Sequence, residues 1–287
     1  MNSFSLPGGR RGSTRRAAAV LVLALIGTAG TGCSSQGRST TVVFSADQPQ
    51  SGSVLTTAAG RMLRRARMLG ISGATAKVTG QSIALTAKGD ERSGLLAVGT
   101  VGLLYLRPVV ADGLSGLSTA PPPDGTVPPA LESAFNSLLC RAGTAAPTVP
   151  ESRTSQIVAC AGQAQDGQWM RYVLDPVVIA GTDVASAVAR NSGTDTGWEV
   201  DLDFDAAGAR AFAAVTQRLA TLTTPGNQIA LEVDGSVLSA PAIASPITGG
   251  KAVISGTFDQ AQAQQLAAQL STGSIPAMRV VSTETTG

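Results

Sequence analysis

Three aspartates stand at alternate positions in the stretch EVDLDFDAAGAR, residues 199–210. Alternating carboxylates before a glycine are typical of a calcium loop. Such a loop needs oxygen ligands at its first, third and fifth positions, a glycine at the sixth and a glutamate at the twelfth. Counting from Asp201, the sixth position is Ala206 and the twelfth is Phe212. The spacing does not fit an EF-hand, and we predict no metal site.

The same stretch fits a strand followed by a helix. With a period of two, the apolar residues face one way and the carboxylates face water, where they form a solvated strand face. Asp205 then caps a helix. The buried side of that helix would carry Phe212, Val215 and Leu219.

Other chemistry is poorly supported by the sequence. The chain has no histidine, which removes the commonest general base and the commonest metal ligand. The sequence SPITGGKAV ends like a phosphate-binding loop, but Ser245 replaces its first glycine and Ala252 follows Lys251. We therefore expect no enzyme activity, no catalytic residue and no cofactor.

The N-terminal segment is typical of a signal peptide, with a basic start, an apolar run at 17–29 and small residues before Cys33. An apolar run of roughly 13 residues is shorter than the roughly 20 that span a bilayer, so an uncleaved anchor is the weaker alternative. The sequence GTGC resembles a lipoprotein cleavage box, with Gly30 where leucine is commonest. We expect a lipid on Cys33 and a chain anchored on the extracytoplasmic face of the cell membrane. The Sec and twin-arginine export routes both stay open.

Charge and cysteine content agree with export. Residues 1–32 hold 4 of the 21 basic residues and none of the 19 acidic ones, so the remaining chain is slightly acidic and nucleic acid is not an expected partner. With Cys33 lipidated, Cys140 and Cys160 remain to form a disulfide in an oxidising exterior. Two buried free thiols are the alternative.

The first third of the chain predicts an alternation of strands and helices. The order strand, helix, strand, strand, helix, strand is that of a ferredoxin-like unit. The expected elements are a strand at 41–44, a helix at 54–69 ended by Gly70, a hairpin around 79–81, a helix near 90–98 and a strand at 102–110. On the first helix, Arg61, Arg64, Arg65 and Arg67 form a basic side. We expect a solvated surface there, with contact to anionic head groups as the alternative.

The rest of the chain mixes irregular and regular segments. Residues 111–129 are rich in Pro, Gly and Ser and predict a flexible loop. The sequence TDVASAVAR predicts a helix that begins at Thr182 or Asp183. Asp234-Gly235 predicts a type I′ hairpin turn. Asp259 is expected to cap a helix that Gly273 and Pro276 end.

The sequences LEVDGSVLSAPAI and ITGGKAVISGTFDQAQAQQLAAQLSTGSIP are similar to the head of the large periplasmic domain (P1) of SecD, a subunit of the Sec protein translocase. Upstream, Arg65, Leu69 and Gly70 resemble an Arg-x-x-x-Leu-Gly pattern of the SecD base. The sequence VAC at 158–160 resembles the actinobacterial branch. The matching head positions are Asp234, Gly235, Ser239, Ala240, Pro241, Gly250, Ile254, Gly256, Phe258, Ala263, Leu270, Gly273 and Pro276, with Ile275 where leucine is usual.

This resemblance implies an α+β fold, with a ferredoxin-like base subdomain and a smaller α+β head like that of SecD P1. The expected organisation is a signal peptide at 1–32, a tether at 33–40, a base-like region at 41–198 with a flexible insert at 111–170, a head-like subdomain at 199–276, and a C-terminal strand and tail at 277–287.

The resemblance also implies a function. SecD continues into transmembrane helices that carry a proton-driven cycle, whereas this sequence ends at Gly287. We therefore expect a stand-alone lipoprotein domain that binds unfolded exported polypeptides or the Sec translocase without pumping. The alternative is an envelope lipoprotein that reuses the fold for another ligand or partner.

Overall fold

The computed structural model describes residues 37–116, 122–142, 152–164, 167–193 and 197–287. The expected signal peptide and Cys33 lie outside the described residues. Within those ranges, no helix is both long and apolar enough to cross a membrane.

The first sheet is antiparallel and has the order β14-β1-β3-β2. Its strands are β1 (Ser39–Ala46), β2 (Thr75–Thr79), β3 (Ser82–Lys88) and β14 (Met278–Thr286). Helices α1 (Gly52–Met68) and α2 (Arg92–Val98) share one apolar core with it. This is the predicted ferredoxin-like base.

The strand that completes the base is not the predicted one. β14 pairs with β1, whereas the strand expected at 102–110 is part of β4 (Leu104–Ser115) and belongs to another sheet. The burial pattern explains the difference. β4 is buried along nearly its whole length, as in a strand covered on both faces, whereas β14 is mostly exposed, as suits a sheet edge.

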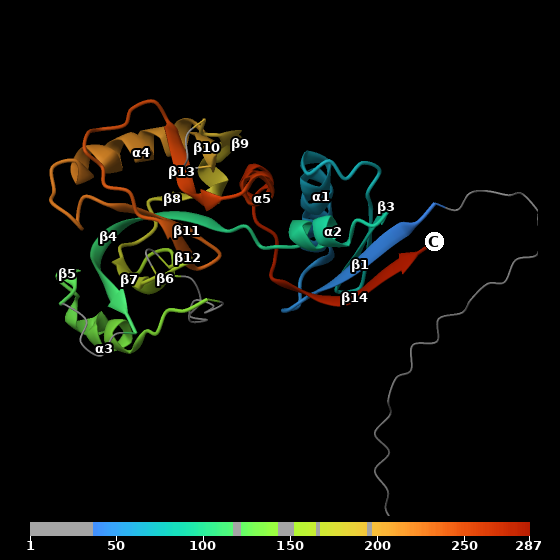
Figure 1. Ribbon diagram of the computed structural model, residues 1–287, viewed down its shortest axis with the longest axis horizontal. Helices are drawn as coiled ribbons and strands as arrows, with labels where there is room; N and C mark the ends of the chain where they lie inside the picture. Colours follow the sequence, from blue (N-terminus) through green and yellow to red (C-terminus); the bar gives the residue numbers. More distant parts are fainter. Residues whose placement is uncertain (1–36, 117–121, 143–151, 165–166, 194–196) are drawn as a thin grey trace, which may run out of the picture. The chain divides into compact units, whose positions relative to one another are not determined.

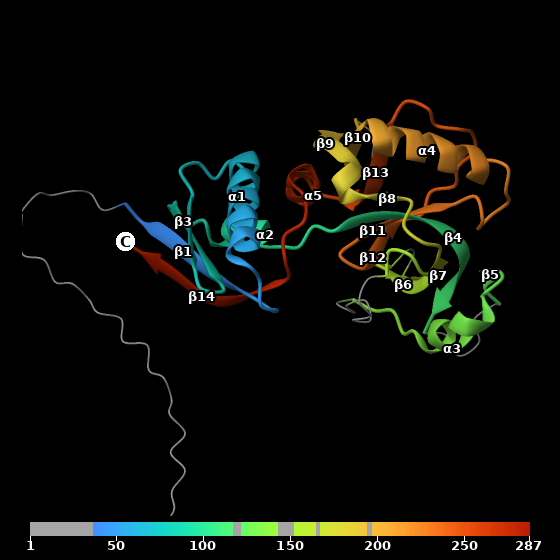
Figure 2. The same cartoon turned by 180° about the vertical axis from the view of Figure 1, so that it is seen from behind.

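Between α2 and β14 the chain forms two further sheets (Figures 1 and 2). In one of them, β4, β7, β6, β12 and β11 pair in succession, and β11 pairs again with β4, so that the strands close into a ring. The other strands are β6 (Ile157–Ala161), β7 (Trp169–Leu174), β11 (Ile229–Val233) and β12 (Ser236–Ser239). Short strands β5 (Asp124–Gly125) and β8 (Ile179–Ala180) also pair with β4, and α3 (Pro129–Ser137) packs near β6 and β7.

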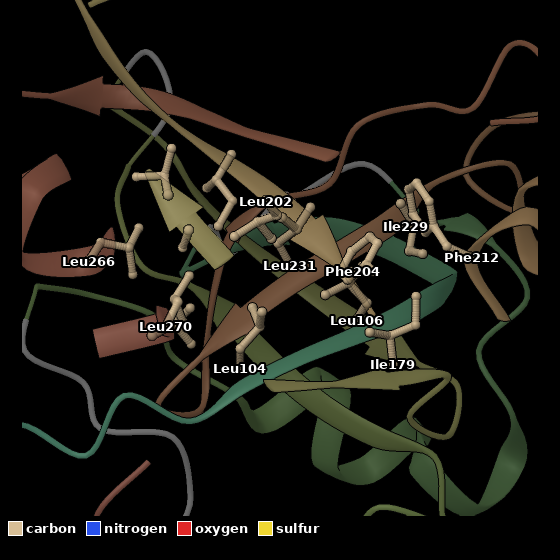
Figure 3. Packing of buried hydrophobic residues seen from close by; sticks show 14 of the residues in the cluster. Leu104, Leu106, Ile179, Leu202, Phe204, Phe212, Ile229, Leu231, Leu266 and Leu270 are labelled. Carbon is tan, nitrogen blue, oxygen red and sulfur yellow. The ribbon is translucent and has the colours of Figure 1, made fainter. Parts of the chain in front are cut away.

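The remaining sheet has the order β13-β10-β9. It consists of β9 (Val184–Asn191), β10 (Trp198–Phe204) and β13 (Lys251–Phe258), with helices α4 (Ala206–Leu219) and α5 (Gln260–Thr272). Figure 3 shows apolar side chains from this sheet, from both helices and from β4 and β11 converging on one core.

Several local predictions are confirmed. Residues 198–204 form a strand, and the Asp205 carboxylate accepts hydrogen bonds from the backbone N–H groups of Ala207 and Gly208 at the start of α4. Asp234 and Gly235 have φ angles of 50° and 82° in the turn between β11 and β12. Asp259 caps α5 through a reciprocal pair of hydrogen bonds with Gln262.

Two other predictions are wrong. Residues 184–191, expected to be helical, form β9, because pairing with β10 and packing against α5 outweigh the helix propensity of the alanines. The segment 111–170, expected as a flexible insert, includes the end of β4, the whole of β5, α3 and β6, and the start of β7. Since β9 also pairs with β10, a base–head boundary at residues 198/199 would divide one sheet.

Candidate functional site

Arg65 lies at the junction between the base and the rest of the chain. Its side chain is fully buried, and its guanidinium donates to the carbonyls of Val98 at 3.0 Å, Val101 at 3.1 Å and Gly273 at 2.9 Å. It also donates to the Thr100 carbonyl and to the Thr272 hydroxyl. The prediction of a solvated Arg65 is therefore wrong. Its carbonyl partners lie in the two segments that link the base to the remaining sheets, so Arg65 fastens both links to α1.

Asp234 holds the first of these links from the other side. Its carboxylate accepts from the backbone N–H groups of Gly102 at 3.1 Å and Leu103 at 2.7 Å. The positive φ of 70° at Gly102 suits glycine, and a Cβ there would lie 2.9 Å from Arg65 Nη2. Burial lowers the pKa of Arg65 to about 10; Asp234 opposes this shift and Arg61 adds to it. Arg65 therefore stays charged at neutral pH.

Three residues of the resemblance motif, Arg65, Asp234 and Gly273, lie together at this junction. The other motif residues have separate roles in turns and close packing. Gly70 follows α1 with a φ of 79°, and Gly235 completes the β11–β12 turn. Gly250 has a φ of 65°, and a Cβ there would lie 2.8 Å from Ala209 Cβ, so this glycine permits close packing against α4. A Cβ on Gly256 would contact the Phe258 ring.

The two prolines of the motif occupy connecting segments. The carbonyl of Pro241 accepts from the Ile229 N–H, which ties the segment after β12 to β11. Pro276 lies between α5 and β14 and lines a small hollow beside α1. These motif residues shape the backbone.

The carboxylates at 199–203 lie on a solvated strand face. Asp201 pairs with Arg190 at 2.8 Å, and Asp203 pairs with Lys251. Across the described ranges, no group of three or more His, Cys, Asp or Glu side chains could hold a metal ion.

Cys140 and Cys160 are joined by a disulfide in the structure, with their Cα atoms 5.5 Å apart. The bond connects the segment after α3 to β6.

Asp112 on β4 lies opposite Asp124 of β5 and Tyr172 of β7. Burial, and next the charge of Asp124, raise the pKa of Asp112 to about 6.

A buried ion pair joins two adjacent strands of the ring, and the sequence did not predict it. Arg107 Nε of β4 lies 2.8 Å from Glu232 Oε2 of β11, and both side chains are buried. Arg107 also donates to the carbonyls of Ser152 and Asp175. Burial raises the pKa of Glu232, while Arg107 opposes this shift. The only signal in the sequence is a charged residue within each of two apolar strands.

A cavity of about 400 Å³ lies beside Arg65, and we call it the junction pocket. It lies where α1, β4, the residues before β6, the β8–β9 link and the end of α5 meet. Its lining residues are Arg61, Gly102, Leu103, Leu104, Tyr105, Arg153, Ala180, Gly181, Thr182, Val184, Leu270, Ser271, Thr272, Gly273 and Ser274.

A second candidate surface follows β13. No described strand pairs with its outer edge, whereas the Ser271 hydroxyl of α5 bonds to both the N–H and the carbonyl of Ala187 on β9, at the opposite edge of the sheet. A hollow of about 200 Å³ lies where β13 meets α5. Its described lining consists of four apolar residues and four glutamines. The lining residues are Gln163, Val233, Leu238, Phe258, Gln262, Gln265, Leu266 and Gln269.

The comparisons with known proteins agree with this arrangement. Residues 155–277 match the family model of the SecDF P1 head subdomain. The SecD protein translocase subunit of Streptomyces coelicolor is 44% identical over 122 residues, which are 42% of this chain and 21% of that protein. SecD of Acetobacter pasteurianus is 41% identical over 105 residues, 37% of this chain and 19% of the relative. The chain thus spans about a fifth of the length of these SecD relatives.

Solved SecDF structures support the fold over a longer stretch. SecDF in its super-membrane-facing form matches with a TM-score of 0.58 at 23% identity, over 86% of this chain and 30% of that one. A structure of SecDF described as a membrane component that enhances protein export matches with a TM-score of 0.53 at 23% identity, over 84% of this chain and 98% of that one. The α+β fold, with its SecDF P1-like arrangement, is therefore shown.

Proposed function

We propose that this chain is a SecD-like domain on the extracytoplasmic face of the membrane, where it is tethered through a lipid on Cys33, binds polypeptides and assists Sec-dependent export without catalysis of its own. The main support is the match of residues 155–277 to the SecDF P1 head subdomain, together with 44% identity to an actinobacterial SecD. We also propose that the domain is of the actinobacterial SecD type.

The β13 surface is the proposed polypeptide site. An extended chain that adds to a sheet edge bonds through its backbone, so it binds with little dependence on its sequence. Leu238, Phe258 and Leu266 in the adjoining hollow would contact an apolar side chain, and the amide of the exposed Gln262 can both donate and accept. Ordering a flexible segment costs roughly 2–5 kcal/mol or more, so we expect micromolar or weaker affinity.

The test has two arms. In membranes that carry the full chain, crosslinking followed by purification should recover translocase subunits. Titration of the purified full chain with an unfolded, reduced secretory protein should show binding, with much weaker binding to the folded form of the same protein. If translocase subunits are not recovered and the unfolded chain is not preferred, the export function is wrong.

The alternative proposal is an envelope lipoprotein that uses the same fold for another ligand, because a fold does not fix a function. The junction pocket is the observation that favours it, since a polar cavity of about 400 Å³ is within the size range of small-molecule sites. If neither the crosslinking nor the titration supports export, this alternative is favoured.

A further inference from the structure

The junction pocket has an unbalanced charge. Among the described residues that line it, Arg61 from α1 and Arg153 from the segment before β6 are the charged ones, and none is an aspartate or a glutamate. Neither arginine forms an ion pair with a described residue. The cavity wall therefore carries two positive charges from separate parts of the chain.

Both guanidinium groups keep hydrogen-bond donors available. A guanidinium has five N–H donors. Arg61 donates through Nη1 to the carbonyl of Ser274, and the guanidinium carbon of Arg153 lies 5.7 Å from the centre of the Tyr105 ring. Stacking on an aromatic ring occupies the face of a guanidinium and leaves the N–H groups at its edge able to bind an acceptor. A ligand in the pocket could therefore accept hydrogen bonds from N–H groups of Arg61 and Arg153.

Three carboxylates on residues that bond to, or neighbour, the lining already have hydrogen-bond partners. Asp234 accepts from the backbone N–H groups of Gly102 and Leu103, Glu232 pairs with Arg107, and Asp183 accepts from the N–H of Ala180. Beneath the wall lies the buried charge of Arg65, whose pKa Arg61 helps to lower. The described lining thus carries two positive charges and no carboxylate, which favours an anion.

The other walls narrow the class of anion. Leu103, Leu104, Val184 and Leu270 supply apolar surface. The carboxyl end of α5, where backbone carbonyls give a partial negative charge, also lines the pocket and disfavours a doubly charged group. A singly charged carboxylate can accept two parallel hydrogen bonds from an arginine, which suits two guanidinium groups.

We propose that the junction pocket binds a carboxylate attached to a compact apolar group, with Arg61 and Arg153 donating to the carboxylate and Leu103, Leu104, Val184 and Leu270 contacting the apolar group. A free small carboxylic acid and the C-terminal residue of a peptide both have this chemistry. The site is separate from the β13 surface and does not depend on a role in export.

Calorimetric titration of the purified full chain at low salt and neutral pH tests the proposal. N-acetyl-leucine supplies the carboxylate and the apolar group, and N-acetyl-leucinamide is its neutral counterpart. A tripeptide ending in leucine, acetylated at its N-terminus, is tested with a free and with an amidated C-terminus, which separates a peptide source from a free acid. We expect the carboxylate form of each pair to bind at least tenfold more tightly than its amide, and inorganic phosphate to bind more weakly than N-acetyl-leucine.

Variants assign the binding to the two arginines. Arg61→Gln and Arg153→Gln should each weaken N-acetyl-leucine binding at least tenfold, and Arg61→Lys should weaken it less than Arg61→Gln. The matched control is Arg64→Gln, since Arg64 is exposed on the same helix and does not line the pocket. Arg153 is exposed, so its replacement leaves the core intact. Equal affinity for acid and amide, tighter binding of phosphate, or unchanged binding in Arg153→Gln would overturn the proposal.

Discussion

Arg65 Nη2 donates to the carbonyl of Gly273 at 2.9 Å, so a residue of the first helix holds the segment that returns the chain to its last strand. The same guanidinium bonds to the carbonyls of Val98, Thr100 and Val101 in the outgoing segment. One buried cation thus donates to backbone carbonyls in both links.

Replacing Arg65 should strongly destabilise the fold. In Arg65→Met the carbonyls of both links lose their charged donor, although Val101 keeps its bond from the Ile275 N–H. Losing several hydrogen bonds from one buried cation should lower the free energy of unfolding by about 3–5 kcal/mol. Urea denaturation of the full chain measures this. Arg64→Met, one position away on an exposed site, should change it by less than about 0.5 kcal/mol. Equal effects of the two substitutions would contradict the role of Arg65 as a clamp.

Asp112 should make stability depend on pH. Its pKa of about 6 in the folded chain exceeds the ordinary value near 4 of an unfolded aspartate. The native state therefore holds the proton more tightly, and the resulting stabilisation is complete below about pH 4 and is lost as the pH rises through about 6. Asp112→Asn lacks this dependence and should be more stable than the unsubstituted chain at pH 7.5 by about 1–2 kcal/mol.

The measurement for Asp112 is the difference in unfolding free energy between the two chains from pH 4 to pH 7.5, because other groups cancel in that difference. Asp124→Asn is the matched control: removing its charge should move the midpoint of the Asp112 effect to lower pH. A difference that stays constant across this range would show that Asp112 does not titrate there.

The disulfide should be present in exported protein and should stabilise it. Cys140 and Cys160 are separated by 20 positions, and closing a loop of that length is worth about 3 kcal/mol in the chain-entropy model. Mass spectrometry of a non-reduced digest should find the two cysteines in one linked peptide pair. The double substitution Cys140→Ser and Cys160→Ser should lower the unfolding free energy by about that amount. Finding both as free thiols would contradict the pairing.

How far the sequence predicts this fold depends on whether the signal is local. The cap at Asp205 and the turn at Asp234-Gly235 depend on a few neighbouring residues, and both are confirmed. The pairing of β1 with β14 joins residues more than 200 positions apart, and no local pattern distinguishes it from a pairing with β4. The alanine-rich segment of β9 has the local pattern of a helix. It forms a strand because it pairs with β10, which the local pattern does not reveal.

The junction was only partly predictable for the same reason. Arg65 and Asp234 both belong to the resemblance motif, yet on its helix Arg65 looks like one more basic surface residue. Its burial depends on carbonyls of residues 98–101 and 273, which the sequence places far away. The Arg107–Glu232 pair likewise becomes visible only once β4 and β11 are paired.

Membrane attachment should depend on Cys33, the expected acylation site after small residues. In cells that produce the full chain, Cys33→Ser should move the protein from the membrane fraction to the soluble fraction, and metabolic labelling with a fatty acid should be lost. The double substitution Cys140→Ser and Cys160→Ser is the control, since it removes the other two cysteines and should leave labelling unchanged. Retention of Cys33→Ser in the membrane fraction would rule out the lipid anchor.

The β13 edge offers a test of polypeptide binding with a built-in control. Val253 on β13 and Val188 on β9 flank the same residue, Asp201, and are exposed by 45% and 57%. A lysine on an edge strand opposes the addition of another strand. If the outer edge of β13 receives the polypeptide, Val253→Lys should weaken binding of an unfolded, reduced secretory protein about fivefold or more.

Val188→Lys adds the same charge to the same sheet, but the Ser271 hydroxyl occupies the backbone groups of Ala187 on the outer edge of β9. That edge cannot accept a strand at this position, so Val188→Lys should bind the unfolded protein as the unsubstituted chain does. Both variants should keep the same unfolding free energy within about 0.5 kcal/mol, because each substitution is on the surface. Equal weakening by the two lysines would indicate a general charge effect, and no weakening by either would place the polypeptide away from β13.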